Sequence, residues 1–465
     1  GRTDMLTYQE VIRRALNGPI STEKDFDLKR FVPAVRRAVK KYDIKYNPET
    51  PVPWDDDLAD RVWQAGKDLI VETGVFCVDS ERIIEFSGVE LEQALKDAPK
   101  DVVVGEGHDA RLVPVRRPES DTPPFCSLGA AGCPVDSEEV LLSLMQAYAE
   151  LPYTDAIPTP SLTRVNGRAI VAGSPLEIEG CIRNVKIAKE ATRRAGRPGL
   201  CIANMVATGV RAAGHIAGHT MGAGKGDMME IGAFAEMKTD FDIMSKVGYM
   251  KSAGCPILGE TGPVLGGYCG GPEGTAVTLA AYHFFALLVL RASLHHPFCV
   301  HFAIQTSTPR EVLWARAMAN QAITRNSDVP CLNVGIITAG PATGMSLYET
   351  AAYVAATVAS GGSIEATGAA QSTHPDYLSP MEPLFAGEVG HAVAGMPRPD
   401  VNDIVLKLLQ KYEDKLNAPP LGIKYQDCFD IASRRPGKEA LEFYSQAREE
   451  LAGWGLEFKD EPFYQ

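Results

Sequence analysis

Two glutamates stand where an α/β barrel would place groups for acid–base chemistry or for holding a cation. Glu260 follows a short apolar run, Pro256–Leu258, and opens a glycine-rich segment that continues to Gly271. Glycine lets the backbone take unusual dihedral angles, or lets a bulky group come close. Glu230 lies on a second such run, Met228–Phe234. A carboxylate at the end of a buried strand is where a barrel of this kind carries its functional groups.

Further side chains fall at the ends of other expected strands, which would bring them to the same mouth. Several carboxylates there would make the mouth negative, which suits a cationic substrate and would raise the pKa of one of them toward the range useful for acid–base work. The alternative is that each glutamate is a solvated or salt-bridged residue of the rim. Beside Glu230 and Glu260, the candidates are Ala203 on the third strand, His301 and Gln305 on the sixth, Val334 and Ile336 on the seventh, and Glu365 on the eighth.

Two histidines have the spacing of metal ligands. His215 and His219 are four residues apart, so on a helix they would share one face. With Glu230, Glu260 or Cys201 they could complete a zinc site. The glycines around them argue against a regular helix, and the other interpretation is a pair of loop histidines near a ligand pocket.

Eight short apolar or β-branched runs alternate with helical patterns from residue 125 onward, which predicts the fold class. This alternation, over roughly 250 residues, favours an α/β fold of the (β/α)8 TIM-barrel type over a doubly wound sheet. The pattern of Thr275–His295 predicts one of the helices, with His295 and His296 at its C-terminal end, where they would complement the helix dipole. The expected strands are Phe125–Gly129, Asp155–Thr159, Gly199–Met205, Met228–Phe234, Cys255–Gly259, Cys299–Thr306, Asn333–Thr338 and Ser363–Thr367.

The flanking regions read as helical, which sets the expected organisation of the chain. Residues 1–123 are predicted to form a helical extension packed on the barrel. Residues 124–400 form the barrel itself, and residues 401–465 form a C-terminal helical segment.

The amino-acid composition argues against some classes of binding partner. The 465 residues carry a net charge of −13, from 46 basic and 59 acidic side chains, without a lysine- or arginine-rich run. Nucleic acid and anionic membranes are therefore poor partners. The polar N-terminus shows no secretion signal, and the apolar stretch at residues 276–290 is too short to span a bilayer. Ten scattered cysteines with no CxxC pair indicate reduced thiols, so a cytoplasmic protein is expected.

The chain resembles the monomethylamine methyltransferase family of methanogenic archaea from end to end. Each matching motif is short, but their order and nearly constant spacing make the resemblance specific. The motifs are DFDL (Asp25–Leu28), GVFCVD (Gly74–Asp79), AGRPG (Ala195–Gly199), PVLGGYCGG (Pro263–Gly271), VH (Val300–His301), AGP (Ala339–Pro341), GEV (Gly387–Val389) and YQDCFD (Tyr425–Asp430).

The resemblance implies a TIM barrel assembled as a hexamer, which passes a methyl group from methylamine to a cognate corrinoid protein. The corrinoid would be carried by that partner, so no tightly bound cofactor is expected. The family's two catalytic glutamates fall on Glu230 and Glu260. Its pyrrolysine falls on Ala203, and its glutamine and tyrosine on the seventh strand fall on Val334 and Ile336.

The differences from the family at Ala203, Val334 and Ile336 change the substrate that we expect. A primary amine is a poor leaving group, and the family's proposed answer is to capture it on pyrrolysine, which Ala203 cannot do. A quaternary ammonium leaves as a neutral tertiary amine, and the related trimethylamine methyltransferase-like proteins include members without pyrrolysine that demethylate betaines. We therefore expect corrinoid-dependent demethylation of an N-methylated, quaternary amine. The alternatives are zinc-assisted methyl transfer from an alcohol, ether or thiol, and a non-catalytic barrel that binds a methylated ligand.

Overall fold

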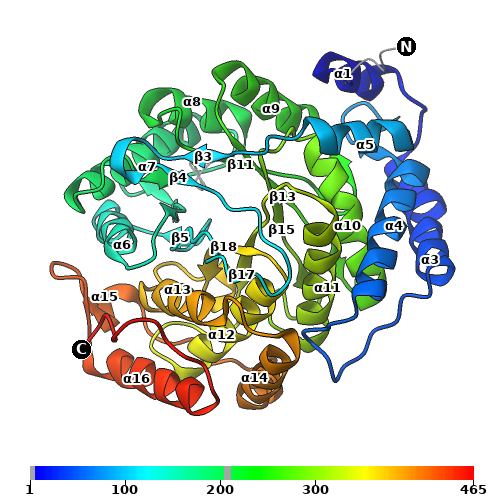
Figure 1. The fold of residues 1–465 in the computed structure, drawn as a ribbon. Helices are drawn as coiled ribbons and strands as arrows, with labels where there is room; N and C mark the ends of the chain where they lie inside the picture. The colour runs from blue at the N-terminus through cyan, green and yellow to red at the C-terminus, as the bar shows by residue number, and fades with distance from the viewer. Residues whose placement is uncertain (1–5, 204–210) are drawn as a thin grey trace.

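The computed structural model describes residues 6–203 and 211–465, which fold around a barrel of parallel strands (Figure 1). Three groups of parallel strands contain most of the staves, that is, the strands of the barrel wall. In these groups β6 pairs with β10, β13 lies between β11 and β15, and β17 pairs with β18. These strands are β6 (Ala156–Ile157), β10 (Cys201–Ile202), β11 (Met229–Gly232), β13 (Ile257–Thr261), β15 (Leu294–Pro297), β17 (Leu332–Ile336) and β18 (Ser363–Gly368).

Single bridges and hydrogen bonds close the ring between these groups. The Met228 N–H donates to the Ile202 carbonyl at 3.0 Å, which joins β10 to β11, and a parallel bridge joins β15 to β17. The segment at residues 126–127 is the first stave, because it bridges β18 on one side and β6 on the other. The TIM barrel predicted from the sequence is confirmed.

Helices cover the outside of the barrel, and α9 shows how local sequence sets their ends. The Asp240 side chain accepts a hydrogen bond from the Ile243 N–H at 2.7 Å, and Gly254 ends the helix with a left-handed φ of 68°. No helix among the described residues is long and apolar enough to cross a bilayer. The covering helices are α6 (Glu138–Glu150), α7 (Pro175–Arg194), α8 (Ala212–Gly222), α9 (Phe241–Ala253), α10 (Pro272–Leu288), α11 (Arg310–Asn326), α12 (Gly344–Ala359) and α13 (Met381–Val393).

The N-terminal residues add a layer outside the barrel. Helices α3 and α4 lie against α10 (Figure 1). Gly66 of α4 permits this close packing, since a Cβ atom there would lie only 2.7 Å from the Cβ of Ala280. This region comprises α1 (Tyr8–Asn17), α2 (Glu23–Asp25), α3 (Val32–Lys41), α4 (Asp56–Thr73), α5 (Gly88–Asp97), β1 (Val75–Cys77), β2 (Arg82–Ile84), β3 (Val103–Val104) and β4 (Arg111–Leu112).

The β3–β4 hairpin closes one end of the barrel. Val104 is fully buried and belongs to one apolar cluster with Leu258 of β13 and Leu294 of β15, which fill the barrel below the carboxylates. This plug leaves the carboxyl ends of the strands as the open end, where a barrel enzyme carries its chemistry.

The C-terminal residues pack on the far side of the barrel. Helices α14 (Arg398–Tyr412) and α16 (Lys438–Gly453) lie against α12 (Figure 1), and α15 (Tyr425–Cys428) precedes a short antiparallel hairpin, β19 (Phe429–Asp430) and β20 (Arg435–Pro436). The expected division of the chain at residues 123 and 400 stays a prediction.

The sixth strand differs from the prediction. Helix α10 ends at Leu288 instead of continuing through His295, and β15 (Leu294–Pro297) is the sixth stave. His295 and His296 therefore lie on a strand, and their assignment to a helix C-terminus is wrong. The chain turns at Arg291, whose φ is 53°, and the Ala292 N–H then donates to the Ala286 carbonyl at 2.9 Å.

His301 and Gln305 are displaced by the same error. His301 belongs to β16 (Val300–His301), which pairs with β14 (Val264–Leu265) beyond the barrel staves, and Gln305 lies in the exposed turn that follows. The expectation that both lie on the sixth barrel strand is wrong.

Candidate active site

Three carboxylates from three strands enter the barrel. Glu230 lies on β11, Glu260 on β13 and Glu365 on β18. In the register of β11 and β13, Glu230 is opposite Leu258, an interior residue, and Gly232 is opposite Glu260. Gly232 leaves room for the acid, because a Cβ atom there would lie 3.0 Å from Glu260 Oε2. The sequence predicted Glu230 and Glu260 as catalytic groups at the open end of the barrel. It predicted Glu365 as a residue that binds the substrate there.

A histidine that the sequence analysis missed joins them. His296 of β15 is opposite Glu260 in the strand register, and its Nε2 lies 3.7 Å from Glu365 Oε2. One ligand atom from each of Glu230, His296 and Glu365 falls within 4.8 Å of the others. The signal was present in the strand pattern: an interior leucine is followed two residues later by a polar residue at Leu258–Glu260 and again at Leu294–His296.

These groups have too few partners for their burial. His296 is 1% exposed and Glu365 is 0% exposed, yet among the described residues neither ring nitrogen of the histidine nor either oxygen of the glutamate has a hydrogen-bond partner. Glu230 is partly exposed, but its Oε2 atom is buried and also lacks a partner within the described part of the chain. Since buried polar atoms are nearly always hydrogen-bonded, such a group of orphaned atoms marks a binding site.

Burial and mutual repulsion shift the proton affinities of these groups. Burial raises the pKa of Glu230 well above its ordinary value, and the neighbouring Glu260 carboxylate raises it further. The same two causes raise the pKa of Glu365. Burial lowers the pKa of His296 to about 3, with a smaller contribution from the Arg316 guanidinium. Without a cation in the site, these shifts favour the neutral imidazole of His296 and the protonated forms of Glu230 and Glu365.

The seventh strand supplies an apolar wall. Val334 is 7% exposed, and its carbonyl accepts a hydrogen bond from Arg316 Nη2 at 2.6 Å. Ile336 is partly exposed, and its N–H donates to Ser307 Oγ at 3.2 Å. Ala203 is fully buried in the interior apolar cluster, and residues 204–210 beside it lie outside the described residues. That these three side chains touch a substrate stays a prediction.

The predicted rim and metal residues lie elsewhere. His301 Nε2 is 3.4 Å from Glu311 Oε1, while Gln371 Nε2 donates to the Ile304 carbonyl at 3.2 Å and ties this segment to the end of β18. His215 and His219 lie on α8, which is a regular helix in spite of its glycines. In the described part of the chain, neither histidine belongs to a group of three side chains that could share a metal ion.

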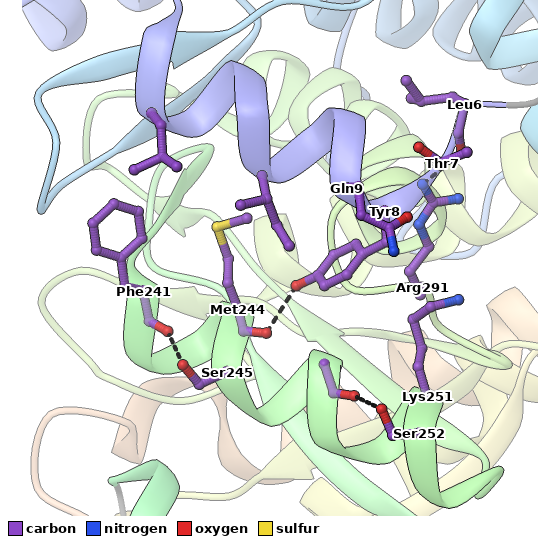
Figure 2. Close-up of a pocket in the computed structure, with 13 residues that line it drawn as sticks. Leu6, Thr7, Tyr8, Gln9, Phe241, Met244, Ser245, Lys251, Ser252 and Arg291 are labelled. Atoms are coloured by element: carbon purple, nitrogen blue, oxygen red, sulfur yellow. Dashed lines mark hydrogen bonds between the residues drawn. The ribbon is translucent and has the colours of Figure 1, made fainter.

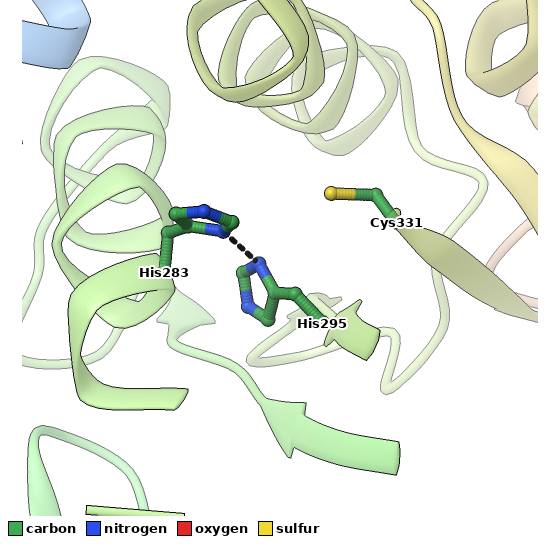
Figure 3. Close-up of side chains that lie close together, drawn as sticks. All are labelled: His283, His295 and Cys331. Atoms are coloured by element: carbon green, nitrogen blue, oxygen red, sulfur yellow. Dashed lines mark hydrogen bonds between the residues drawn. The ribbon is translucent and has the colours of Figure 1, made fainter. Parts of the chain in front are cut away.

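A second group of histidines is explained by hydrogen bonding. His283 of α10 and His295 of β15 face each other across 2.9 Å between their Nδ1 atoms, with Cys331 close by (Figure 3). His295 Nε2 is 2.6 Å from Thr261 Oγ1, and His283 Nε2 is 2.8 Å from Ser327 Oγ. Every ring nitrogen in this pair has a partner, so the group reads as a polar network that joins α10 to the barrel wall.

A surface cavity of about 860 Å³ lies apart from these groups, between α1 and α9 (Figure 2). Its walls are largely apolar, and the Tyr8 hydroxyl donates to the Met244 carbonyl at 2.8 Å across it. Lys251 and Arg291 stand at one end (Figure 2). The carboxylates of the barrel do not line it.

Comparison with known proteins assigns the family. The family model described as monomethylamine methyltransferase MtmB matches residues 6–456. The monomethylamine methyltransferase MtmB of Methanosarcina mazei is 31% identical over 447 residues, covering 96% of this chain and 97% of that protein. MtmB1 of Methanosarcina barkeri shows the same identity and coverage.

Two solved structures agree with this assignment. The crystal structure of the Methanosarcina barkeri monomethylamine methyltransferase matches with a TM-score of 0.95 and 30% sequence identity, covering 98% of this chain and 100% of that one. The hydroxylamine complex of MtmB matches equally well. The resemblance noted in the sequence is confirmed: the chain belongs to the monomethylamine methyltransferase MtmB family and is a methyltransferase.

Proposed function

We propose that this chain moves a methyl group from an N-methylated, quaternary amine to a corrinoid carried by a cognate partner protein, without pyrrolysine. Family membership supports the corrinoid-dependent methyl transfer. The observation that carries the choice of substrate is the interior of the barrel: carboxylates enter it from three strands, while Ala203 and Val334 stand at the positions where the resemblance places pyrrolysine and glutamine.

The carboxylates suit a substrate that is already a cation. A buried positive charge is stable only when it is compensated, and Glu260, partly exposed toward the open end of the barrel, is placed to provide that compensation. The apolar faces of Val334 and Ile336 fit the methyl groups of a quaternary ammonium better than the N–H groups of a primary amine, which need hydrogen-bond acceptors. The side chains therefore bind and orient the cation, and the apolar plug closes the end of the barrel below it.

The chemistry of the leaving group supports the same choice. Cob(I)alamin held by the partner supplies the nucleophile, which attacks the methyl carbon. As the new bond to carbon forms, the C–N bond breaks and its electron pair stays on nitrogen, so a neutral tertiary amine departs without an added proton. Because the β3–β4 hairpin closes the other end, the partner is expected to approach from the carboxyl ends of the strands. A hexamer, as the family resemblance implies, is part of this proposal.

The test is an optical assay with a panel of methyl donors. The protein is mixed with cob(I)alamin and separately with monomethylamine, several betaines, choline, methanol and a thioether, with and without the cognate corrinoid protein. The proposal predicts methylcobalamin formation with a quaternary amine and none with monomethylamine. Formation with monomethylamine alone would contradict it.

A second candidate is methyl transfer from an alcohol, ether or thiol with help from a metal ion. The ligand set first considered for it, around His215 and His219, does not come together in the described residues. The group of Glu230, His296 and Glu365 favours it instead, since a Lewis acid there could lower the pKa of the leaving group. Signal in the panel with methanol or the thioether would select this candidate.

A further inference from the structure

We propose that Glu230, His296 and Glu365 form a binding site for one divalent transition-metal ion, of the zinc class, inside the barrel. The site is independent of the methyl donor, so it can exist whether or not the quaternary amine is the substrate. Its ligands come from three different strands, β11, β15 and β18, which hold them on the rigid wall of the barrel.

The ligand atoms lie close enough together for side-chain rotation to bring them around one ion. All three offered atoms lie within 4.8 Å of one another, and His296 Nε2 is 3.7 Å from Glu365 Oε2. Ligands bound to Zn²⁺ at about 2.0–2.2 Å in a tetrahedral site are roughly 3.3–3.5 Å apart. Side-chain rotation that brings the His296 and Glu365 atoms closer by about 0.2–0.4 Å, and the pairs with Glu230 by at most about 1.5 Å, would close the site.

The buried polar atoms without partners support the metal site independently of the spacing of its ligands. Both oxygens of Glu365 and both nitrogens of His296 are buried without hydrogen-bond partners in residues 6–203 and 211–465. Leaving such atoms unpaired in the folded protein lowers its stability. A metal ion placed among them would satisfy an imidazole nitrogen and two carboxylate oxygens at once, which no described protein group does.

The charges also balance with an ion present. Glu230, Glu260 and Glu365 together could carry three negative charges in a closed interior. A divalent ion and a quaternary ammonium together carry three positive charges. Glu260 is outside the metal group and stays available to the substrate, so the ion and the cation would occupy different carboxylates.

The ligand types narrow the ion. One imidazole and two carboxylates are borderline-hard donors that suit Zn²⁺, Co²⁺, Mn²⁺ or Fe²⁺ more than Cu⁺ or Ca²⁺. The neighbouring group of His283, His295 and Cys331 would instead offer a thiolate. Its imidazoles are already paired with each other, with Thr261 and with Ser327, so it serves as a matched control.

The first experiment measures metal content. The full-length protein is incubated with Zn²⁺, desalted, and analysed by inductively coupled plasma mass spectrometry. We expect close to one ion per chain in the wild type. In Glu365→Gln and His296→Ala, we expect the affinity for Zn²⁺ to fall by at least about 100-fold, since loss of a direct ligand exceeds the 10- to 100-fold cost of losing an outer partner. The control Cys331→Ser is expected to keep its ion.

Two results would overturn the proposal. One is a wild-type protein that retains no ion after incubation with Zn²⁺, and the other is full metal content in both Glu365→Gln and His296→Ala. Loss of the ion in Cys331→Ser alone would also overturn it, because the ion would then belong to the other group.

A spectroscopic measurement on the wild type tests the proposal even if the variants fail to fold. Co²⁺ bound at the proposed site should give visible d–d bands without the intense near-ultraviolet charge-transfer band of a cobalt–thiolate bond. A thiolate band would assign the ion to Cys331 and contradict the proposal. None of these readouts depends on turnover, so a metal site can be confirmed even if the panel of methyl donors shows a different substrate.

Discussion

At the scale of single residues, Glu260 carries the proposed role of compensating the cation. It is partly exposed, as Glu230 is, but unlike Glu230 it lies outside the group of three side chains that could hold a metal. Replacing its charge while keeping its shape should therefore affect substrate binding and the transition state more than the fold.

We expect Glu260→Gln to lower the rate of methyl transfer by about 100-fold or more, in the range found when a group that stabilises transition-state charge is removed. The rate is measured as methylcobalamin formed under saturating donor. Glu139→Gln, an exposed residue in the first turn of α6, is the control and should leave the rate unchanged. An unchanged rate in Glu260→Gln would remove this carboxylate from the mechanism.

The apolar wall can be tested separately at Val334. A glutamine there would put an amide against the methyl groups of the substrate and leave that amide without partners. We expect Val334→Gln to raise the KM for the quaternary amine by at least about 10-fold, the scale on which pockets discriminate small changes of this kind. A steady-state titration of the donor checks this, and an unaltered KM would mean that Val334 does not face the substrate.

At the scale of elements, the strand rhythm predicted the barrel and most of its mouth, because each strand carries an apolar run of its own. Glu230, Glu260 and Glu365 were found on strands in this way and lie on strands in the structure. The sixth strand was missed because the apolar residues of α10 run almost into β15, and because two histidines before Pro297 look like the end of a helix. His296 was therefore not predicted as a residue of the site.

What the sequence could not reveal is which side chains meet across the barrel. Glu230, His296 and Glu365 are far apart in the chain, and only the closed ring of strands brings their ligand atoms within 4.8 Å. The lack of partners also follows from packing, since no local pattern shows that the Glu365 oxygens find no hydrogen-bond partner among the described residues. Such features depend on tertiary structure alone.

The connection after β11 offers a prediction of pH dependence. Glu236 is 2% exposed, and its Oε1 accepts a hydrogen bond from the Val264 N–H at 3.2 Å, at the start of β14. Burial raises its pKa from 4.5 to about 7. The folded protein therefore keeps a proton that the unfolded chain releases between these two values, so the contribution of Glu236 to stability falls as the pH rises from about 4.5 to about 7.

Replacing the ionisable side chain of Glu236 should remove this loss of stability at high pH. We expect Glu236→Gln to be more stable than the wild type at pH 8, by up to about 3 kcal/mol, and to differ little from it at pH 4.5. Urea unfolding at the two pH values measures the difference. A variant that is less stable than the wild type at pH 8 would show that the carboxylate is compensated in the folded protein.

At the scale of the whole molecule, the barrel is a chamber closed at one end. The β3–β4 hairpin and the interior leucines fill the lower end, and the carboxylates stand above them. We therefore propose that substrate and partner protein share the open end, which fits a reaction in which a methyl group passes directly from a small cation to a large acceptor. The family to which the chain belongs carries out methyl transfer, and our proposal rests on the resemblance that places Ala203 and Val334 at the positions expected to handle a primary amine.

The most direct measurement is therefore a comparison of two donors in a single-turnover reaction. The protein, its corrinoid partner and reduced cobalamin are mixed with either a betaine or monomethylamine, and both methylcobalamin and the released amine are quantified. The account predicts one tertiary amine released for each methylcobalamin formed from the betaine, and no methylcobalamin from monomethylamine. Equal or faster transfer from monomethylamine, with ammonia as the product, would contradict the central claim that this barrel takes a quaternary amine.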